Sequence, residues 1–128
     1  MDKEKPRRRV MVVEDNIDTV RTLVALLRSD GHEVEYAING YAAIALAPKF
    51  RPEVMILDLG LPGLNGFEVC TRLKREPGLE KTRFIAVSGY YTDADRVRSR
   101  AVGCEAHLPK PADPREILAI VASEAPPT

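Results

Sequence analysis

The chain has 128 residues, which is enough for one domain with a substantial hydrophobic core. Its 19 basic and 19 acidic residues leave no net charge, which argues against a general binder of nucleic acid or of membrane surfaces. No apolar run is long enough to cross a bilayer and no export signal is visible, so we expect a cytoplasmic protein.

The first nine residues, MDKEKPRRR, are charged and predict a flexible leader. Arg7–Arg9 are too few to indicate contact with nucleic acid or acidic lipid, and a solvated tail is the preferred interpretation. We expect one domain over residues 10–124 and a frayed tail over 125–128. Cys70 and Cys104 have no metal-ligand spacing, which is typical of core thiols in a reduced protein.

Five short segments are predicted to form strands. Val54–Leu57 is a continuous apolar run, as expected for a central strand that is buried on both faces. Glu33–Ala37 alternates polar and apolar side chains, which suits a strand near the sheet edge. The other three are Val10–Val13, Phe84–Val87 and Ala106–Leu108.

Each predicted strand is followed by a predicted helix. Asn16 or Asp18 caps the first helix, and apolar residues recur at helical spacing from Val20 to Leu27. The expected limits of the others are Tyr41–Ala47 stopped by Pro48, a start near Asn65-Gly66, Thr92–Ala101, and a start at the cap Asp113.

The fourth of these helices is unusually polar. Only Ala94, Val97 and Ala101 are apolar in Thr92–Ala101, among several Asp and Arg residues. So narrow an apolar stripe predicts a helix that the core holds weakly, and a plain solvated helix is the competing interpretation.

The alternation of strands and helices predicts an α/β fold, a five-stranded parallel sheet with helices on both faces. The carboxyl ends of parallel strands share one edge, where α/β proteins bind ligands. The side chains expected at that edge are Glu14 and Asp15, Asp58, Ser88 and Lys110.

This set of side chains suits phosphoryl chemistry on a metal. Three neighbouring carboxylates repel one another, and Mg²⁺, which prefers oxygen ligands, removes that penalty. Lys110 is a point charge suited to a phosphoryl oxygen, Ser88 offers a hydroxyl, and the Asp58 carboxylate can attack phosphorus. Each residue has a simpler interpretation: helix-start acids at Glu14-Asp15, a turn at Ser88 and a solvated loop at Lys110. Their joint placement at successive strand ends is what favours a site.

The chain resembles the CheY-like receiver domain of two-component response regulators, over nearly its whole length. The motifs that carry the resemblance are VMVVEDN, ILDLGLPGLNG, AVSG and AHLPKP. The resemblance implies a (βα)5 flavodoxin-like fold in which Asp58 accepts a phosphoryl group from the phosphohistidine of a histidine kinase or histidine phosphotransfer protein. It implies a signalling module rather than an enzyme, which catalyses only its own phosphorylation and a slow dephosphorylation.

The resemblance also assigns roles around Asp58. Asp15, Asp58 and the Gly60 carbonyl are expected to bind Mg²⁺, with Glu14 acting through a bound water. Lys110 is expected to pair with Asp58, with a cis bond between Lys110 and Pro111.

Signal output is expected to pass through one movement, in which Ser88 turns to the phosphoryl group. The ring three residues before Lys110 follows it and changes the surface of the fourth helix, last strand and fifth helix, where an output partner binds. A homodimer through that surface is left open.

Three positions depart from the family pattern or bear on rate. The ring position holds His107 in place of Tyr or Phe, which predicts weaker or pH-dependent coupling, against the alternative that His107 simply packs or faces solvent. Gly60 has no side chain to position a hydrolytic water and Tyr90 shields the approach, so we expect slow self-dephosphorylation.

Two other protein classes fit the sequence less well. A haloacid-dehalogenase-like phosphatase wants a second Asp where this chain has Gly60, and Glu14-Asp15-Asn16 would repel the phosphate of a flavin. The sequence also leaves open whether the chain is a free-standing receiver or one excised from a longer regulator or hybrid histidine kinase.

Overall fold

A five-stranded parallel sheet forms the centre of the structure, a computed structural model that describes residues 6–89 and 91–124. The spatial order is β2-β1-β3-β4-β5, which is the flavodoxin-like order. The predicted α/β fold class is therefore confirmed. The strands are β1 (Arg9–Val13), β2 (Glu33–Ala37), β3 (Val54–Asp58), β4 (Arg83–Ser88) and β5 (Cys104–Pro109).

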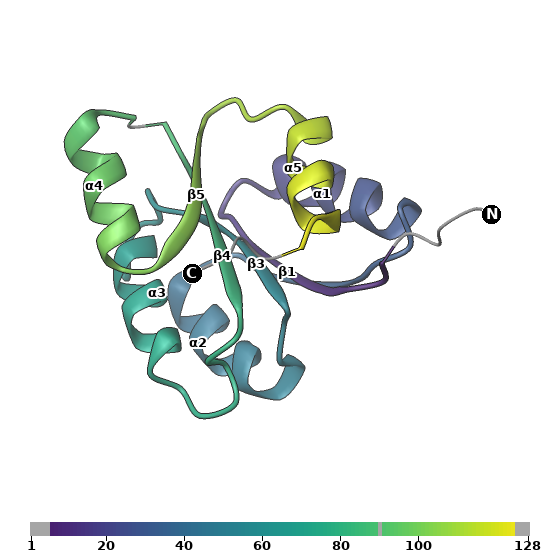
Figure 1. Ribbon diagram of the computed structural model, residues 1–128, viewed down its shortest axis with the longest axis horizontal. Coiled ribbons are helices and arrows are strands. Elements are labelled where there is room, and N and C mark those ends of the chain that lie inside the picture. The colour runs from purple at the N-terminus through teal and green to yellow at the C-terminus, as the bar shows by residue number, and fades with distance from the viewer. Residues whose placement is uncertain (1–5, 90, 125–128) are drawn as a thin grey trace.

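Helices cover both faces of this sheet (Figure 1). Helices α1 and α5 lie on one side, and α2, α3 and α4 lie on the other. Each side has its own apolar cluster, one formed with α2 and α3 and one formed with α1 and α5. The helices are α1 (Ile17–Ser29), α2 (Gly40–Phe50), α3 (Gly66–Lys74), α4 (Asp93–Ala101) and α5 (Pro114–Ala122).

Strand β3 is the strand on which both clusters meet. All five of its residues are buried, as the continuous apolar run predicted. Successive strand side chains point to opposite faces, so Met55 and Leu57 enter the cluster under α2 and α3, whereas Val54 and Ile56 enter the cluster under α1 and α5. Because β3 is central, the residue at its end, Asp58, lies in the middle of the carboxyl edge. The predicted edge position of β2 is also confirmed.

Three asparagines fix the starts of the helices that follow β1, β2 and β3. The side chains of Asn16, Asn39 and Asn65 each accept a hydrogen bond from a backbone amide in the first turn, at 3.1, 2.8 and 3.0 Å. Asn16, rather than Asp18, is therefore the cap of α1. Asp113 caps α5, with Pro114 at its first position, as predicted.

The predicted end of α2 at Pro48 is wrong. The helix runs through Pro48 to Phe50 and ends at Arg51, which adopts a left-handed conformation with φ 54°. Pro48 lies in the last turn, where the missing N–H removes a single hydrogen bond, and the Arg51 amide still bonds to the Ala47 carbonyl at 2.8 Å. Buried Ala43 and Ala47 hold that turn against the sheet.

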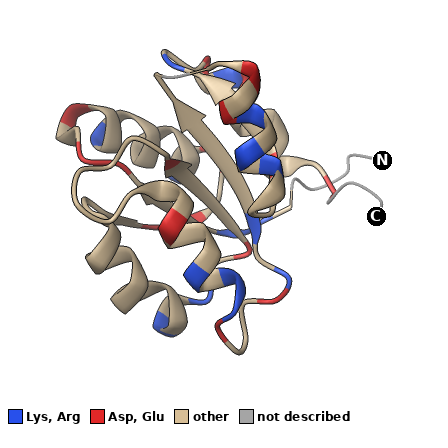
Figure 2. Cartoon of the chain, turned by 90° about the vertical axis from the view of Figure 1, so that its left-hand side faces the viewer, with Lys and Arg blue, Asp and Glu red and all other residues tan. Residues whose placement is uncertain are grey.

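The apolar residues of α4 do not face the core, which agrees with the prediction that the core holds this helix weakly. Thr92 is the cap rather than the first helical residue, and it forms a capping box with Asp95. Ala94, Val97 and Ala101 are exposed. Figure 2 shows that α4 is acidic at its first turn and basic further along, a distribution that complements the helix dipole.

Two arginines hold the C-terminal end of α5, one from the start of the described chain and one from β4. Strand β1 begins at Arg9, one residue before the predicted strand, and the Arg8 guanidinium donates to the Val121 carbonyl at 2.6 Å. Arg83 forms a bidentate pair with Glu105 at 2.7 and 2.8 Å and donates to the Ser123 carbonyl at 2.8 Å. Residues 1–5 and 125–128 lie outside the described part, and the division into leader, domain and tail stays a prediction.

Both cysteines are buried free thiols, as predicted for core residues. The Cys70 thiol donates to the Val102 carbonyl at 3.2 Å, which ties α3 to the turn before β5. Among the helices of the described residues, none combines the length and the apolar character that crossing a bilayer requires.

Candidate phosphoryl-transfer site

The side chains predicted for the carboxyl edge do lie there. Glu14 directly follows β1, Asp58 ends β3, Ser88 ends β4 and Lys110 directly follows β5. Glu14, Asp58 and Ser88 are buried, although each is ionisable or polar. Buried polar groups of this kind need partners, and the two carboxylates find them in backbone amides and in the Lys110 ammonium.

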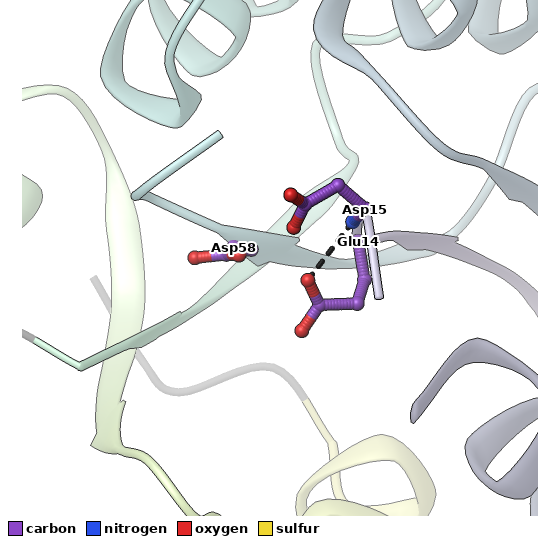
Figure 3. A group of neighbouring side chains, drawn as sticks. All are labelled: Glu14, Asp15 and Asp58. Carbon is purple, nitrogen blue, oxygen red and sulfur yellow. Dashed lines mark hydrogen bonds between the residues drawn. The ribbon is translucent and has the colours of Figure 1, made fainter. Parts of the chain in front are cut away.

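Three carboxylates form the centre of this edge (Figure 3). Glu14, Asp15 and Asp58 each offer an oxygen, and these oxygens all lie within 4.8 Å of one another. Asp15 is exposed, whereas Glu14 and Asp58 are 5% and 6% exposed. The cluster is therefore open to solvent on the Asp15 side and closed on the other.

Each buried carboxylate is held by backbone amides on one side. Glu14 Oε2 accepts from the amides of Asp15 and Asn16 at 2.9 and 3.3 Å, at the start of α1. Asp58 Oδ1 accepts from the Gly60 amide at 2.8 Å. A Cβ added at Gly60 would lie 3.5 Å from Asp58 Oδ1, an ordinary contact. The structure thus places the Gly60 amide against Asp58, whereas a metal bond to the Gly60 carbonyl stays a prediction.

Lys110 bridges the two buried carboxylates. Its ammonium donates to Glu14 Oε1 at 2.7 Å and to Asp58 Oδ2 at 2.9 Å. The Lys110–Pro111 bond is cis, as expected, and the Lys110 amide donates to the Ser88 carbonyl at 2.9 Å. The solvated-loop interpretation of Lys110 is therefore wrong.

The ionisation of these groups reflects their crowding. Burial raises the pKa of the Glu14 carboxyl above its ordinary value, the Lys110 bond opposes this, and Asp15 and Asp58 raise the pKa further. Burial alone would lower the pKa of Lys110, but its bonds to Glu14 and Asp58 outweigh burial and raise it. The cluster thus has three carboxyl groups and one ammonium, and this excess of acidic groups favours a bound cation.

The donor set fits Mg²⁺. All the side-chain donors are carboxylate oxygens, the class of ligand that Mg²⁺ prefers, and one side of the cluster is open for water or phosphate oxygens. A divalent ion would also relieve the repulsion that raises the pKa of Glu14.

Two other predicted residues lie near this cluster without joining it. Ser88 is buried at the end of β4, where its carbonyl accepts the Lys110 amide. His107 is half-buried on β5 and bonds to Ser99 on α4, with 3.1 Å between Nδ1 and Oγ. His107 thus has a polar partner on α4, and its role as a switch stays a prediction. Tyr90, predicted to shield the site, lies outside the described residues.

The sequence missed a groove beside the acidic cluster. It has a volume of about 610 Å³ and runs between α1 and the start of α5. Glu14, Asp58 and Lys110 form its polar end, and Leu23 and Ile117 belong to its apolar wall. The groove joins residues almost a hundred positions apart, which no local pattern could indicate. Ser99 was also missed, and a lone serine within a polar helix gave no signal.

Comparisons with known proteins agree with this geometry. The family model of the response regulator receiver domain matches residues 10–122. Response regulator PleD of Caulobacter vibrioides is 33% identical over 115 residues, which are 90% of this chain and 25% of PleD. Protein PilH of Pseudomonas aeruginosa is 32% identical over 110 residues, 86% of this chain and 91% of PilH.

A solved structure is also similar. It is a response regulator protein from Burkholderia pseudomallei with a phosphorylated aspartic acid, a calcium ion and citrate. The two structures superpose with a TM-score of 0.82 at 28% identity, covering 92% of this chain and 67% of that one.

Proposed function

The chain belongs to the response-regulator receiver family of two-component signalling, and from this premise we propose that Asp58 is its phosphoryl acceptor. The donor is the phosphohistidine of a histidine kinase or histidine phosphotransfer protein. The observation that carries the proposal is the Lys110 ammonium, which bonds to Asp58 and Glu14 together within a cluster of three carboxylates. The phosphorylated aspartic acid of the Burkholderia protein supports it.

The reaction is a transfer between two nucleophiles. A carboxylate oxygen of Asp58 attacks phosphorus, so an O–P bond forms while the N–P bond to the donor imidazole breaks, and the imidazole nitrogen keeps the bonding pair. Lys110 supplies a positive charge beside the attacked group, and the Gly60 amide holds one Asp58 oxygen at 2.8 Å. Positioning and charge neutralisation are what such a transfer needs most.

The proposed Mg²⁺ site uses the same cluster. Asp15, Asp58 and the Gly60 carbonyl would hold the ion, with Glu14 acting through a water. When bound, Mg²⁺ neutralises charge on the transferring phosphoryl oxygens. The calcium ion of the Burkholderia protein supports a divalent cation in this family.

Metal dependence is the direct test of this proposal. We expect the protein to gain one phosphoryl group when incubated with acetyl phosphate and Mg²⁺, as measured by the mass of the intact chain. Replacing Mg²⁺ with EDTA should reduce the gain to background, because three carboxylates with a single ammonium would repel an incoming phosphate. Equal phosphorylation in EDTA would contradict the metal site but not the identity of the acceptor.

Mg²⁺ should also stabilise the fold. At a concentration of 100 times the dissociation constant, a ligand that binds only the native state adds about 2.7 kcal/mol, which raises the unfolding midpoint by several degrees. Asp15→Asn should remove most of this rise, because Asp15 is the exposed ligand. Asp18→Asn is the matched control, an exposed acid of the same helix region outside the cluster, and it should keep the full rise.

The effect of Mg²⁺ should depend on pH in a defined direction. The pKa of Glu14 is raised above its ordinary 4.5, so from 4.5 to the folded-state pKa the native state binds more protons than the unfolded state. In that window the contribution of Glu14 to stability falls as pH rises, and protons compete with the metal. The midpoint rise given by Mg²⁺ should therefore shrink as pH falls through the window, and a larger rise at acidic pH would be inconsistent with carboxylate ligands.

Output follows from the position of the site. Phosphorylation draws the Ser88 hydroxyl toward the phosphoryl group, His107 moves with it, and the surface of α4, β5 and α5 changes for an output partner. The protein catalyses only its own phosphorylation and a slow dephosphorylation, the latter because Gly60 has no side chain to position water. We place this activity in the cytoplasm. The match covers almost the full length of PilH but only a quarter of PleD, so among the relatives the receiver occurs both nearly alone and as part of a longer protein.

A further inference from the structure

Helix α4 is attached to the domain in an unusual way. Its apolar side chains face solvent, and Val97 is 69% exposed. The one buried residue of α4 is Ser99, which is 1% exposed. A helix that buries a hydroxyl in place of an apolar stripe gains little from hydrophobic burial, so its attachment depends on what that hydroxyl bonds to.

The directions of the Ser99 hydrogen bonds can be assigned. The Ser99 hydroxyl has one proton, and it donates to the Arg96 carbonyl at 3.0 Å within the same helix. While the hydroxyl proton is used in the Arg96 bond, Ser99 Oγ accepts from His107 Nδ1, which lies 3.1 Å away. In this arrangement the proton of the bond is carried by Nδ1. The bond joins α4, which carries Ser99, to β5, which carries His107.

The other side of the His107 ring has no such partner. Nε2 is buried and makes no hydrogen bond within residues 6–89 and 91–124. Burial lowers the pKa of His107, Asp95 opposes this and Arg96 adds to it, so the neutral ring with its proton on Nδ1 is the favoured form. Tyr91 meets the ring edge-on at 5.0 Å between centroids. The Ser99 bond is therefore the polar contact that orients His107.

We propose that Ser99 is the residue through which His107 holds helix α4, and that phosphorylation loosens α4 by breaking the bond between Ser99 and His107. The phosphorylation step rests on the proposed function. When His107 turns away with Ser88, Nδ1 leaves Ser99 Oγ, and the only buried side chain of α4 loses its link to β5. The Tyr or Phe that the family usually has at this position carries no Nδ1, so we expect this coupling only where the position holds His, as in this protein.

The remaining contacts of α4 do not replace that link. Arg98 lies over the Phe67 ring at 4.0 Å, which connects α4 to α3. Arg96 pairs with Asp93 and lies 5.1 Å from the Tyr91 ring, so both of these contacts stay within α4 or the turn before it. Loss of the Ser99 bond should therefore weaken the attachment of α4 to β5, while the edge contact of Tyr91 with His107 and the Arg98 contact with α3 remain.

The test is a double-mutant cycle read by hydrogen exchange of the α4 amides. We expect Ser99→Ala to speed their exchange by about tenfold at most and by at least twofold, the range of one net hydrogen bond. His107→Phe keeps a ring but removes Nδ1, so it should speed exchange similarly, and adding Ser99→Ala to it should change nothing more. Val97→Ala is the matched control: it changes an exposed α4 side chain, and because Ala is the better helix former it should not speed exchange.

Phosphorylation supplies the second arm of the test. In the wild-type protein, acetyl phosphate with Mg²⁺ should speed α4 exchange, whereas in Ser99→Ala it should add little to an already fast exchange. The coupling would be overturned if Ser99→Ala sped α4 exchange equally in the wild-type and His107→Phe backgrounds, or did not speed it at all. It would also be overturned if phosphorylation sped α4 exchange in Ser99→Ala as much as in wild type. Absence of phosphorylation in every variant would instead overturn the proposed function, and the exchange of the unphosphorylated proteins would still decide the Ser99–His107 link.

Discussion

Asp58→Asn is expected to abolish phosphorylation while leaving the fold intact. The amide of Asn is not a nucleophile toward phosphorus, yet it matches the carboxylate in size and can still accept the Gly60 amide that Asp58 Oδ1 accepts at 2.8 Å. Lys110 keeps its second partner, because its 2.7 Å bond to Glu14 does not involve Asp58. The variant therefore removes the reacting group without leaving the ammonium unpaired.

The measurement is the mass of the intact chain after incubation with acetyl phosphate and Mg²⁺. Wild type should gain one phosphoryl group and Asp58→Asn none. Asp18→Asn is the matched control, because Asp18 is an exposed carboxylate on the same groove and outside the acidic cluster. A variant that gained the same mass as wild type would show that another side chain accepts the group.

Gly66→Ala should destabilise the protein more than any other glycine replacement between β3 and α3. A Cβ at Gly66 would lie 2.6 Å from the Leu59 Cα and closer still to the Asp58 carbonyl oxygen, so the clash is with the backbone at the end of β3. The end of β3 cannot shift without displacing Asp58. Overpacking against backbone should cost at least about 3 kcal/mol of unfolding free energy.

Urea unfolding of the two variants Gly66→Ala and Gly89→Ala would check this expectation. Gly89 also follows a site strand, but a Cβ there would meet nothing within 4 Å, so Gly89→Ala should unfold close to the wild-type midpoint. If Gly66→Ala kept the wild-type midpoint, the close approach of α3 to the end of β3 would be incorrect.

The acidic edge could be predicted because its determinants are local. Val54–Asp58 is apolar until its last residue, and a parallel sheet brings every such strand end to one edge. The asparagines at positions 39 and 65 likewise mark helix starts by side-chain bonds to the next turn, whereas the sequence left the first cap open between Asn16 and Asp18.

What the sequence did not reveal depends on tertiary contacts. Pro48 is a helix breaker by its own chemistry, but buried neighbours in the last turn of α2 hold the helix through it. The face that α4 turns inward carries Ser99, because the partner waiting on β5 is a polar ring rather than an apolar surface. Hydrophobic periodicity has no means of finding a helix that is anchored by one hydrogen bond.

The arginine contacts at the far end of α5 set how that helix can move. Arg8 from the start of the chain and Arg83 from β4 both grip its last carbonyls, whereas its first turn lies beside the groove and Lys110. A helix that is fixed at its C-terminal turn can move most at its N-terminal turn. We therefore expect a rearrangement of α5 to pivot about its C-terminal turn, with the largest displacement next to the proposed phosphorylation site.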